Sequence, residues 1–350
     1  MSQSIFSSRS YPRLKNNYTM KKLQVAGSPV FLFQNAETRA LLVGALEFKE
    51  KTLRFRLGRQ HFNGLRNMDL DMATHLLMLS SEFQKSISRF EHPKETVGAL
   101  LMREPIAQNP FLNASLANIN SRLYVLLDVH HVADSKGIKG KSGQLSYYRL
   151  DLPDNEQQQE KIRSEIRHAL LCDSIAAGRN LITAIKELKE RFKNLEKVTV
   201  VSVFATKEGV QRISQFCQKE MGLNCQFFVF QELLSVNPVN EYDCFYPQTS
   251  HDLRDERLLK KILGKHIHRL CMGGDFTANI YGKAQAQAVF EEQVAALGFD
   301  PQKRLGSEIT LKELKALGYS FDDLLPYSTL YVASEQGVSL EMLKKQFEKN

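Results

Sequence analysis

Short apolar runs alternate along the chain with segments whose apolar residues recur every three to four positions. The apolar run 166–171 leads into a loop of small residues, 172–180, and an amphipathic segment follows it. The same succession returns further on, with an apolar run at 198–204 and an amphipathic segment from residue 207. This pattern predicts strands that alternate with helices.

Other apolar runs extend this prediction. Further strands are predicted at 30–33, 97–102, 122–129 and 226–230. Alternation of this kind predicts an α/β fold with an open, mostly parallel sheet flanked by helices on both faces. In such sheets ligands bind beyond the carboxyl ends of the strands, and Arg103, Asp173 and Glu208 fall there.

Other parts of the chain have less regular patterns. Apolar spacing predicts one helix from about 69 to 90 and a mixed helical stretch from about 36 to 48. The alternation at 54–59 fits either a strand face or a basic helix. The cationic, glycine-bearing segment 134–143 is expected to be a flap-like loop, and residues 231–265 show no clear period.

Three regions are expected. Residues 1–19 form a flexible basic N-terminus, residues 20–284 the main domain and residues 285–350 a small helical appendage. The appendage is predicted from its punctuation: Thr310 and Glu313 form a capping box, Gly318 ends that helix, and Ser339 caps the last one.

The composition excludes several classes of protein. The 350 residues are 43% hydrophobic, with no apolar run long enough to span a bilayer and no secretory signal at the start, so a soluble cytoplasmic protein is expected. The five Cys form no Cys-x-x-Cys pair. Neither a Gly-x-Gly-x-x-Gly fingerprint nor a Walker loop is present, which argues against a dehydrogenase or an ATPase.

Positive charge is concentrated in the first part of the chain. The net charge is +8, and residues 1–66 hold twelve Lys and Arg against three Glu. A segment of this kind can bind nucleic acid, an anionic substrate or an acidic partner, and a solvated basic face is the more ordinary interpretation. Nucleic-acid binding has no other support in the sequence.

The loop before the predicted helix is a candidate phosphate site. Backbone N–H groups at a helix N-terminus and the positive end of the helix dipole favour an anion, and a glycine lets a ligand approach the backbone. The alternative is an ordinary strand-to-helix turn. The candidate phosphate-binding residues are Ser174, Ile175, Ala176, Ala177, Gly178, Arg179 and Asn180.

Motifs in a fixed order add a family resemblance. They are the segments 147–153 (YYRLDLP), 172–180 (CDSIAAGRN) and 204–209 (FATKEG), and the pairs Gly274-Asp275 and Tyr281-Gly282. Weaker similarities lie at 34–38 and 100–103. With these motifs, residues 20–284 resemble uracil phosphoribosyltransferases, a type I phosphoribosyltransferase-like family.

The resemblance implies a reaction and a set of roles. Uracil would displace pyrophosphate from phosphoribosyl pyrophosphate to give uridine monophosphate, a pyrimidine salvage step that uses Mg²⁺, and the chain would form a homodimer. The loop would hold the 5′-phosphate, and Asp173 and Arg103 would be catalytic, facing the ribose hydroxyls and the pyrophosphate. Base-binding residues would be Met272, Gly273, Gly274 and Asp275, and Asp275 would also serve the metal.

Several positions depart from the family pattern. Cys172, Ala177, Arg179 and Asn180 stand where the family has Asp, Thr, Gly and Ser. These departures support an alternative hypothesis, a catalytically degenerate relative that binds a nucleotide and acts as a regulatory or interaction protein.

Overall fold

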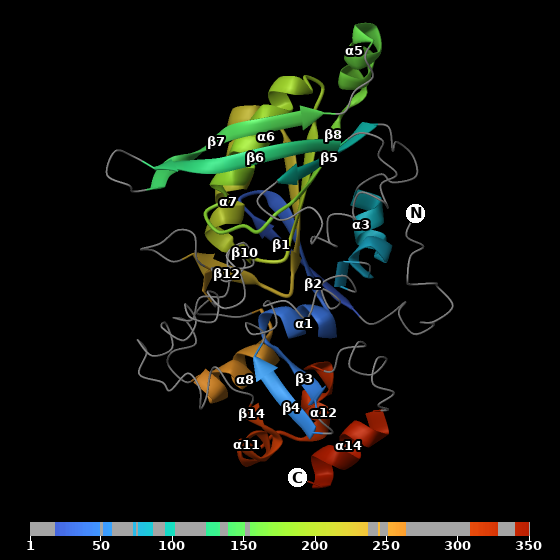
Figure 1. Ribbon diagram of the computed structural model, residues 1–350, viewed down its shortest axis with the longest axis vertical. Coiled ribbons are helices and arrows are strands. Elements are labelled where there is room, and N and C mark those ends of the chain that lie inside the picture. Colours follow the sequence, from blue (N-terminus) through green and yellow to red (C-terminus); the bar gives the residue numbers. More distant parts are fainter. Residues whose placement is uncertain are drawn as a thin grey trace.

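A twisted, mostly parallel sheet organises the upper part of the molecule in this computed structural model (Figure 1). The structure describes residues 18–49, 52–57, 73–74, 76–86, 95–101, 124–133, 139–150, 155–236, 244–245, 251–263, 309–327 and 340–349. Within them the sheet has eight strands in the order β1-β2-β11-β9-β8-β5-β6-β7. Their bounds are β1 Thr19–Val25, β2 Ser28–Gln34, β5 Thr96–Leu101, β6 Tyr124–Ala133, β7 Lys139–Leu150, β8 His168–Cys172, β9 Lys197–Ser202 and β11 Asn224–Phe230.

The six central strands of this sheet are parallel, whereas β1 and β7 pair antiparallel at its edges. Helices lie on both faces. The predicted α/β class with a mostly parallel sheet and flanking helices is therefore confirmed. All five residues of β8 are buried, as expected of a central strand covered on both sides.

Side chains from the two faces of the sheet form two apolar clusters. On one face α6 (Arg179–Arg191) and α7 (Lys207–Phe216) bury residues such as Leu188 and Ile213 against Leu171. On the other face Phe83 of α3 (Ser81–Ser86) meets Phe228 edge to face, with ring centroids 5.0 Å apart. The predicted helices after residues 180 and 207 are confirmed, and α7 continues into a π-helical turn, η5 (Cys217–Met221).

Two predictions near the N-terminus are corrected. The stretch 36–48 is not one helix, because α1 (Ala36–Leu42) ends and the strand β3 (Gly44–Lys49) follows. The ambiguous segment 54–59 belongs to a strand, β4 (Thr52–Leu57), which pairs antiparallel with β3. Cross-strand pairing, which the local pattern does not contain, decides both cases.

Two further boundaries differ from expectation. The helix predicted over 69–90 is interrupted at Ser80, whose hydroxyl accepts a hydrogen bond from the N–H of Phe83 (3.3 Å) and so starts α3 anew. The flap-like loop predicted over 134–143 is shorter, because residues 139–143 already belong to β7. They pair with the extended end of β6, so the hairpin projects from the sheet (Figure 1).

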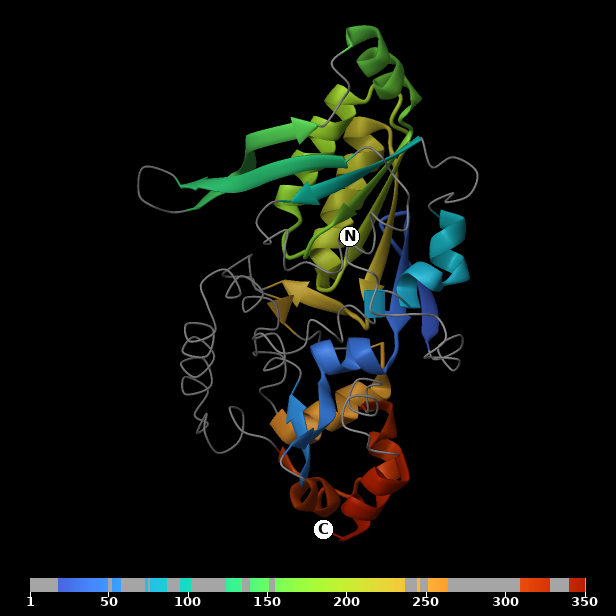
Figure 2. The same ribbon diagram turned by 45° about the vertical axis from the view of Figure 1, so that its right-hand side comes forward.

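Below the sheet lies a second, mainly helical unit (Figure 2). It contains β3, β4, α8 (Leu253–Leu263), β14 (Ile309–Thr310), α11 (Leu311–Ala316), α12 (Phe321–Leu324), η8 (Leu325–Tyr327) and α14 (Leu340–Lys349). We refer to these elements as the lower unit. Both ends of the chain contribute, since β14 pairs with β4.

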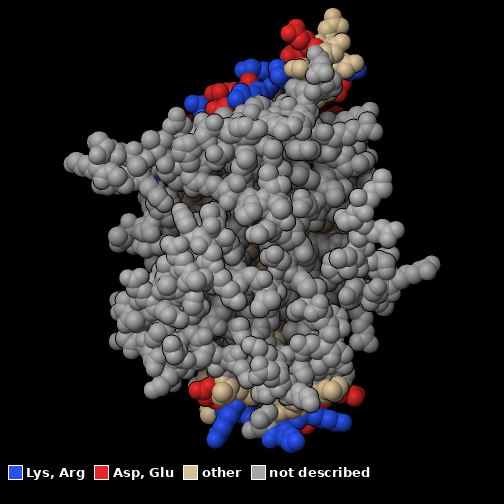
Figure 3. Space-filling view, viewed as in Figure 1, with Lys and Arg blue, Asp and Glu red and all other residues tan. Residues whose placement is uncertain are grey.

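The capping box and the glycine stop predicted for the helix after residue 310 are confirmed. Thr310 and Glu313 form the capping box of α11, and Gly318 has φ +83° at its end. Ser339 and the predicted boundary at residue 284 lie outside the described residues, so the domain limits stay a prediction. α14 exposes Lys344, Lys345 and Lys349. Figure 3 shows Lys and Arg side chains, with Asp and Glu beside them, at the lower and upper ends of the molecule. In the described ranges, no helix combines the length and the hydropathy of a membrane span.

Candidate functional site

The loop between β8 and α6 lies at the carboxyl edge of the parallel sheet, as predicted. Hydrogen bonds from the neighbouring segment fix its backbone. The N–H of Ile175 donates to the carbonyl of Phe204 (2.6 Å), and the N–H of Thr206 donates to the carbonyl of Ile175 (2.8 Å). The hydroxyl of Thr206 also donates to the carbonyl of Ala176 (2.6 Å). The loop backbone is therefore held by the short strand β10 (Ala205–Thr206).

Two glycines allow this close approach. Gly178 has φ +77°, in the left-handed region that side chains disfavour, and a Cβ there would lie 2.9 Å from Cγ1 of Ile213. A Cβ on Gly209, in the first turn of α7, would lie 2.1 Å from the carbonyl oxygen of Ala176. The loop and the start of α7 therefore form one packed unit.

The N-terminus of α6 has no side-chain cap and no acidic residue in its first turn. Asn35 and Thr206 cap α1 and α7 in contrast. The first N–H groups of α6 have no partner within the helix, and they carry the positive end of its dipole. Arg179 begins the helix, and Arg212 donates to the carbonyl of Ala177 (3.0 Å). The site is therefore suited to an anion.

The predicted site residues of this loop lie in different environments. Asp173 and Ser174 are half-buried, and Oδ1 of Asp173 accepts the N–H of Ser174 (2.8 Å). Ala177 and Gly178 are buried. The side-chain oxygen of Asn180 is buried and has no hydrogen-bond partner within the described ranges. Cys172 points into the apolar cluster on the α3 face and is 5% exposed.

The other predicted site residues lie outside the described part of the chain. They are Arg103, Met272, Gly273, Gly274 and Asp275, and their roles stay predictions. Glu208, also expected at this edge, is bound to the backbone: its Oε2 accepts the N–H of Val236 (3.2 Å) at the end of β12 (Leu233–Val236). Within the described ranges no group of three or more His, Cys, Asp or Glu could hold a metal ion.

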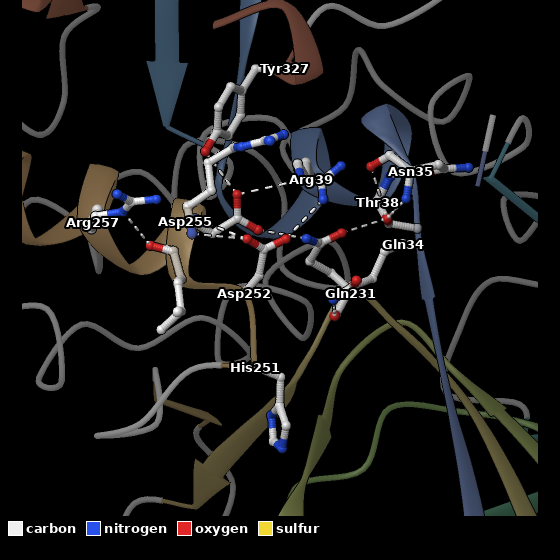
Figure 4. Close-up of polar contacts among 12 residues, drawn as sticks. Gln34, Asn35, Thr38, Arg39, Gln231, His251, Asp252, Asp255, Arg257 and Tyr327 are labelled. Carbon is white, nitrogen blue, oxygen red and sulfur yellow. Dashed lines mark hydrogen bonds and ion pairs between the residues drawn. The ribbon is translucent and has the colours of Figure 1, made fainter. Parts of the chain in front are cut away.

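A polar cluster that the sequence interpretation missed lies at the same edge, directly after β11 (Figure 4). Gln231 is held at φ +60°, unusual for a residue with a side chain. Its amide donates to Asp255 (2.6 Å), its side-chain oxygen accepts from the hydroxyl of Thr38 (2.8 Å), and its carbonyl accepts from Gln34 (2.8 Å). These contacts compensate the strained backbone and join β2, β11 and α8.

The cluster continues through an ion-pair network that links α1 to the lower unit. Arg39 contacts Asp252 (2.8 Å) and Asp255 (3.4 Å), and the hydroxyl of Tyr327 donates to Asp255 (2.8 Å). Burial raises the pKa of Asp255 to about 6, although Arg39 opposes that shift. Burial and the neighbouring carboxylate also raise the pKa of Tyr327, whereas the hydrogen bond and charge of Arg39 lower the pKa of Asp252 despite its partial burial.

The expectation that functional residues follow the carboxyl ends of parallel strands could have located this cluster. Gln231 and Glu232 are the first polar residues after an apolar strand, the same signal that identified Asp173. Their partners at 251–255 could not be assigned, because those residues lie in a segment without a visible period. The weak motif at 34–38 has a structural role here: Asn35 and Thr38 form the capping box of α1.

No family model matches the sequence, and a search of curated proteins also finds no match. Among solved structures, an adenine phosphoribosyl transferase from Trypanosoma brucei, in complex with AMP, pyrophosphate and ribose-5-phosphate, is 10% identical with a TM-score of 0.37; the match covers 71% of this chain and all of that one. An adenine phosphoribosyltransferase from Leishmania donovani is also 10% identical, with a TM-score of 0.30, and covers 61% of this chain and 87% of that one.

Proposed function

We propose that this chain is a phosphoribosyltransferase-type protein that binds phosphoribosyl pyrophosphate and transfers its phosphoribosyl group to a nucleobase. The observation that carries the proposal is the loop 173–178 at the carboxyl edge of the sheet. Its left-handed Gly178 and the N-terminus of α6, which lacks a side-chain cap, suit the 5′-phosphate. The ordered sequence motifs, which resemble those of uracil phosphoribosyltransferases, support the same assignment.

The reaction makes physical demands that this edge of the sheet can meet. The sugar becomes cation-like at its anomeric carbon, so catalysis consists mainly of holding two phosphate groups while the base approaches. In the proposal, the loop holds the 5′-phosphate, and the carboxylate of Asp173 accepts the ribose hydroxyls. Arg103 contacts the pyrophosphate, and residues 272–275 lie beside the base.

Magnesium belongs to the proposal through the substrate. Mg²⁺ is usually bound by one or two carboxylates together with substrate phosphates, so a preformed cluster of ligands is not needed. The half-buried carboxylate of Asp173 is of the right chemistry, and Asp275 is the ligand that the sequence motif predicts. The bound ion would neutralise charge on the departing pyrophosphate.

The preferred base is the finer part of the proposal. We infer uracil from the sequence motifs, which gives uridine monophosphate and pyrophosphate as products and places the protein in pyrimidine salvage. The two structures described above have adenine in their names, but at their TM-scores they do not bear on the base. The assay must therefore include adenine, guanine and hypoxanthine beside uracil.

One observation favours a second candidate, a catalytically silent nucleotide-binding protein. Cys172 occupies the position where the family has an acid, and its side chain is buried among apolar residues. It therefore supplies no acid to a ribose. Asp173 would have to bind the ribose hydroxyls without a second acid. If one acid is not enough for catalysis, the site binds the nucleotide but does not turn it over.

A turnover assay separates the two candidates. The full chain is incubated with Mg²⁺, phosphoribosyl pyrophosphate and each nucleobase, and pyrophosphate release is measured. We expect release with uracil and at least a 100-fold loss in Asp173→Asn. Calorimetric binding of phosphoribosyl pyrophosphate without release from any base would support the silent protein. Absence of both binding and release would refute both candidates.

A further inference from the structure

A buried carboxylate, Glu232, orients a partly exposed histidine, His251. Nδ1 of His251 is 3.1 Å from Oε1 of Glu232, which also accepts the backbone N–H of His251. The Glu232 side chain is 2% exposed, whereas that of His251 is 38% exposed. Figure 4 shows the imidazole pointing away from the Asp252–Asp255 network. This arrangement holds one ring nitrogen and presents the other.

Strand register places this pair close to the phosphate loop. Ile175 of the loop forms a parallel bridge with Ala205, and Ala205 pairs with Leu233 of β12. Ile175 and Leu233 are therefore two strand spacings apart, roughly 10 Å. Glu232 directly precedes Leu233. This separation is of the order of a nucleoside monophosphate's length, so a ligand whose phosphate lies on the loop can extend toward Glu232, which holds His251.

The charged neighbours of His251 are few in the described structure. Glu232 faces the ring from the end of β11, and Nζ of Lys21 in β1 donates to the backbone carbonyl of His251 (2.5 Å). The adjacent Asp252 is paired with Arg39. In the described ranges no residue hydrogen-bonds Nε2 of His251. A carboxylate on Nδ1–H assigns the tautomer that leaves Nε2 as a proton acceptor.

We propose that His251, oriented by Glu232, accepts the proton of the attacking nucleobase. This inference rests on the proposed transferase function. As the bond from the base nitrogen to the anomeric carbon forms, the bond from that carbon to the pyrophosphate oxygen breaks, and pyrophosphate leaves with the electron pair. The nitrogen's proton passes to Nε2 of His251, and Glu232 stabilises the imidazolium that results. The substrate class is a nucleobase whose reacting nitrogen carries a hydrogen.

The experiment compares His251→Gln, Glu232→Gln and the unmodified chain. We expect His251→Gln to lower kcat/KM by about 100-fold or more, with phosphoribosyl pyrophosphate affinity within about twofold. The loss of rate toward acid pH should disappear in this variant, and added imidazole should restore part of the rate. Glu232→Gln should lower the rate by about tenfold, because the ring remains but loses its orienting charge.

Glu196→Gln is the matched control, because Glu196 forms an ion pair with Arg167 (2.5 Å) at the opposite edge of the same sheet. It should leave the rate and its pH profile unchanged. If Glu232→Gln does not fold, as judged by circular dichroism, His251→Gln alone decides. An active parent whose rate and pH profile survive His251→Gln would overturn this inference and leave the transferase standing. A parent that turns over no base would overturn both.

Discussion

Gly178 is the residue on which the conformation of the loop 173–178 depends. Its φ of +77° is unfavourable for any side chain, and its neighbour Ile213 would contact a Cβ at 2.9 Å. Gly222, at the end of η5, separates these two effects. It has φ +64°, and no atom lies within 4 Å of the position of its Cβ. The two glycines therefore share the backbone cost and differ in the packing cost.

Gly178→Ala is predicted to destabilise the fold more than Gly222→Ala does. Backbone strain alone costs about 1 kcal/mol, and Gly178→Ala adds the contact with Ile213. Urea unfolding measures both variants. Gly178→Ala should also weaken binding of phosphoribosyl pyrophosphate by at least tenfold, whereas Gly222→Ala should bind like the parent. Equal affinity in all three proteins would show that the loop is only a turn.

A polar ladder crosses three strands inside the sheet. Nε2 of His168 in β8 is 2.8 Å from the hydroxyl of Thr199 in β9, and Gln226 in β11 donates to the same hydroxyl (2.7 Å). Burial, with the nearby charge of Lys197, lowers the pKa of His168 to about 3. The ring is therefore neutral in the folded protein at all but strongly acid pH.

His168 is predicted to make the fold sensitive to acid. Its folded pKa is lowered, so between pH 6.5 and about 3 the unfolded chain binds the additional proton. Its contribution to the unfolding free energy is therefore intact above pH 6.5 and is lost as pH falls, at up to about 1.4 kcal/mol per pH unit.

His168→Gln should lose this dependence, because its amide can still reach Thr199 but does not titrate in this range. The test is urea unfolding of both proteins at pH 7 and pH 4.5. The difference between parent and variant should shrink at the lower pH. A constant difference would mean that His168 is protonated in the folded state.

The strands show how much of the fold local pattern can predict. β8, β9 and β11 were located because each is a mainly apolar run that is buried on both faces. β1, β3 and α8 were missed. β1 alternates polar and apolar residues on an edge, and β3 is a strand because β4 pairs with it. Edge strands, and strands defined by pairing with a neighbour, therefore have weaker hydrophobic patterns in the sequence than central strands.

The candidate site was predictable to a similar extent. The loop 173–178 was located from the junction between an apolar run and a helical period. Glu232 and His251 were not paired, because both lie in the segment 231–265, whose sequence shows no clear period. The side-chain direction of Cys172 was also hidden, since the family pattern places an acid there and only the sheet's alternation shows that it points inward.

At the scale of the whole molecule, Arg39 connects the sheet with the lower unit. Asp255 in α8 and Asp252, just before that helix, both contact Arg39. Tyr327 in η8 donates a hydrogen bond to Asp255. One guanidinium thus stands against two carboxylates in a largely buried setting. Removing it would leave both without their cation, and breaking a buried pair on one side typically costs 3–5 kcal/mol.

Arg39→Met is therefore predicted to lower the unfolding free energy by about 3 kcal/mol and to loosen the lower unit first. Arg167→Met is the matched control, because the Arg167–Glu196 pair is exposed and should be worth less than about 1 kcal/mol. Urea unfolding measures the cost, and hydrogen exchange in α12 and α14 reports the loosening. Uniform exchange across sheet and lower unit in Arg39→Met would contradict this assignment.

Sheet order also has a consequence for how the chain folds during synthesis. Phe31 in β2 pairs in register with Phe228 in β11, and Phe55 in β4 pairs with Ile309 in β14. β2 therefore lacks its partner strand β11 until residue 230 has been synthesised, and β4 lacks β14 until residue 310 has been synthesised. Such long-range closure is slow and exposes the nascent chain to aggregation. In nascent chains that end before residue 224, β1 and β2 can thus pair only with each other, without β11. We expect such chains to depend on chaperones.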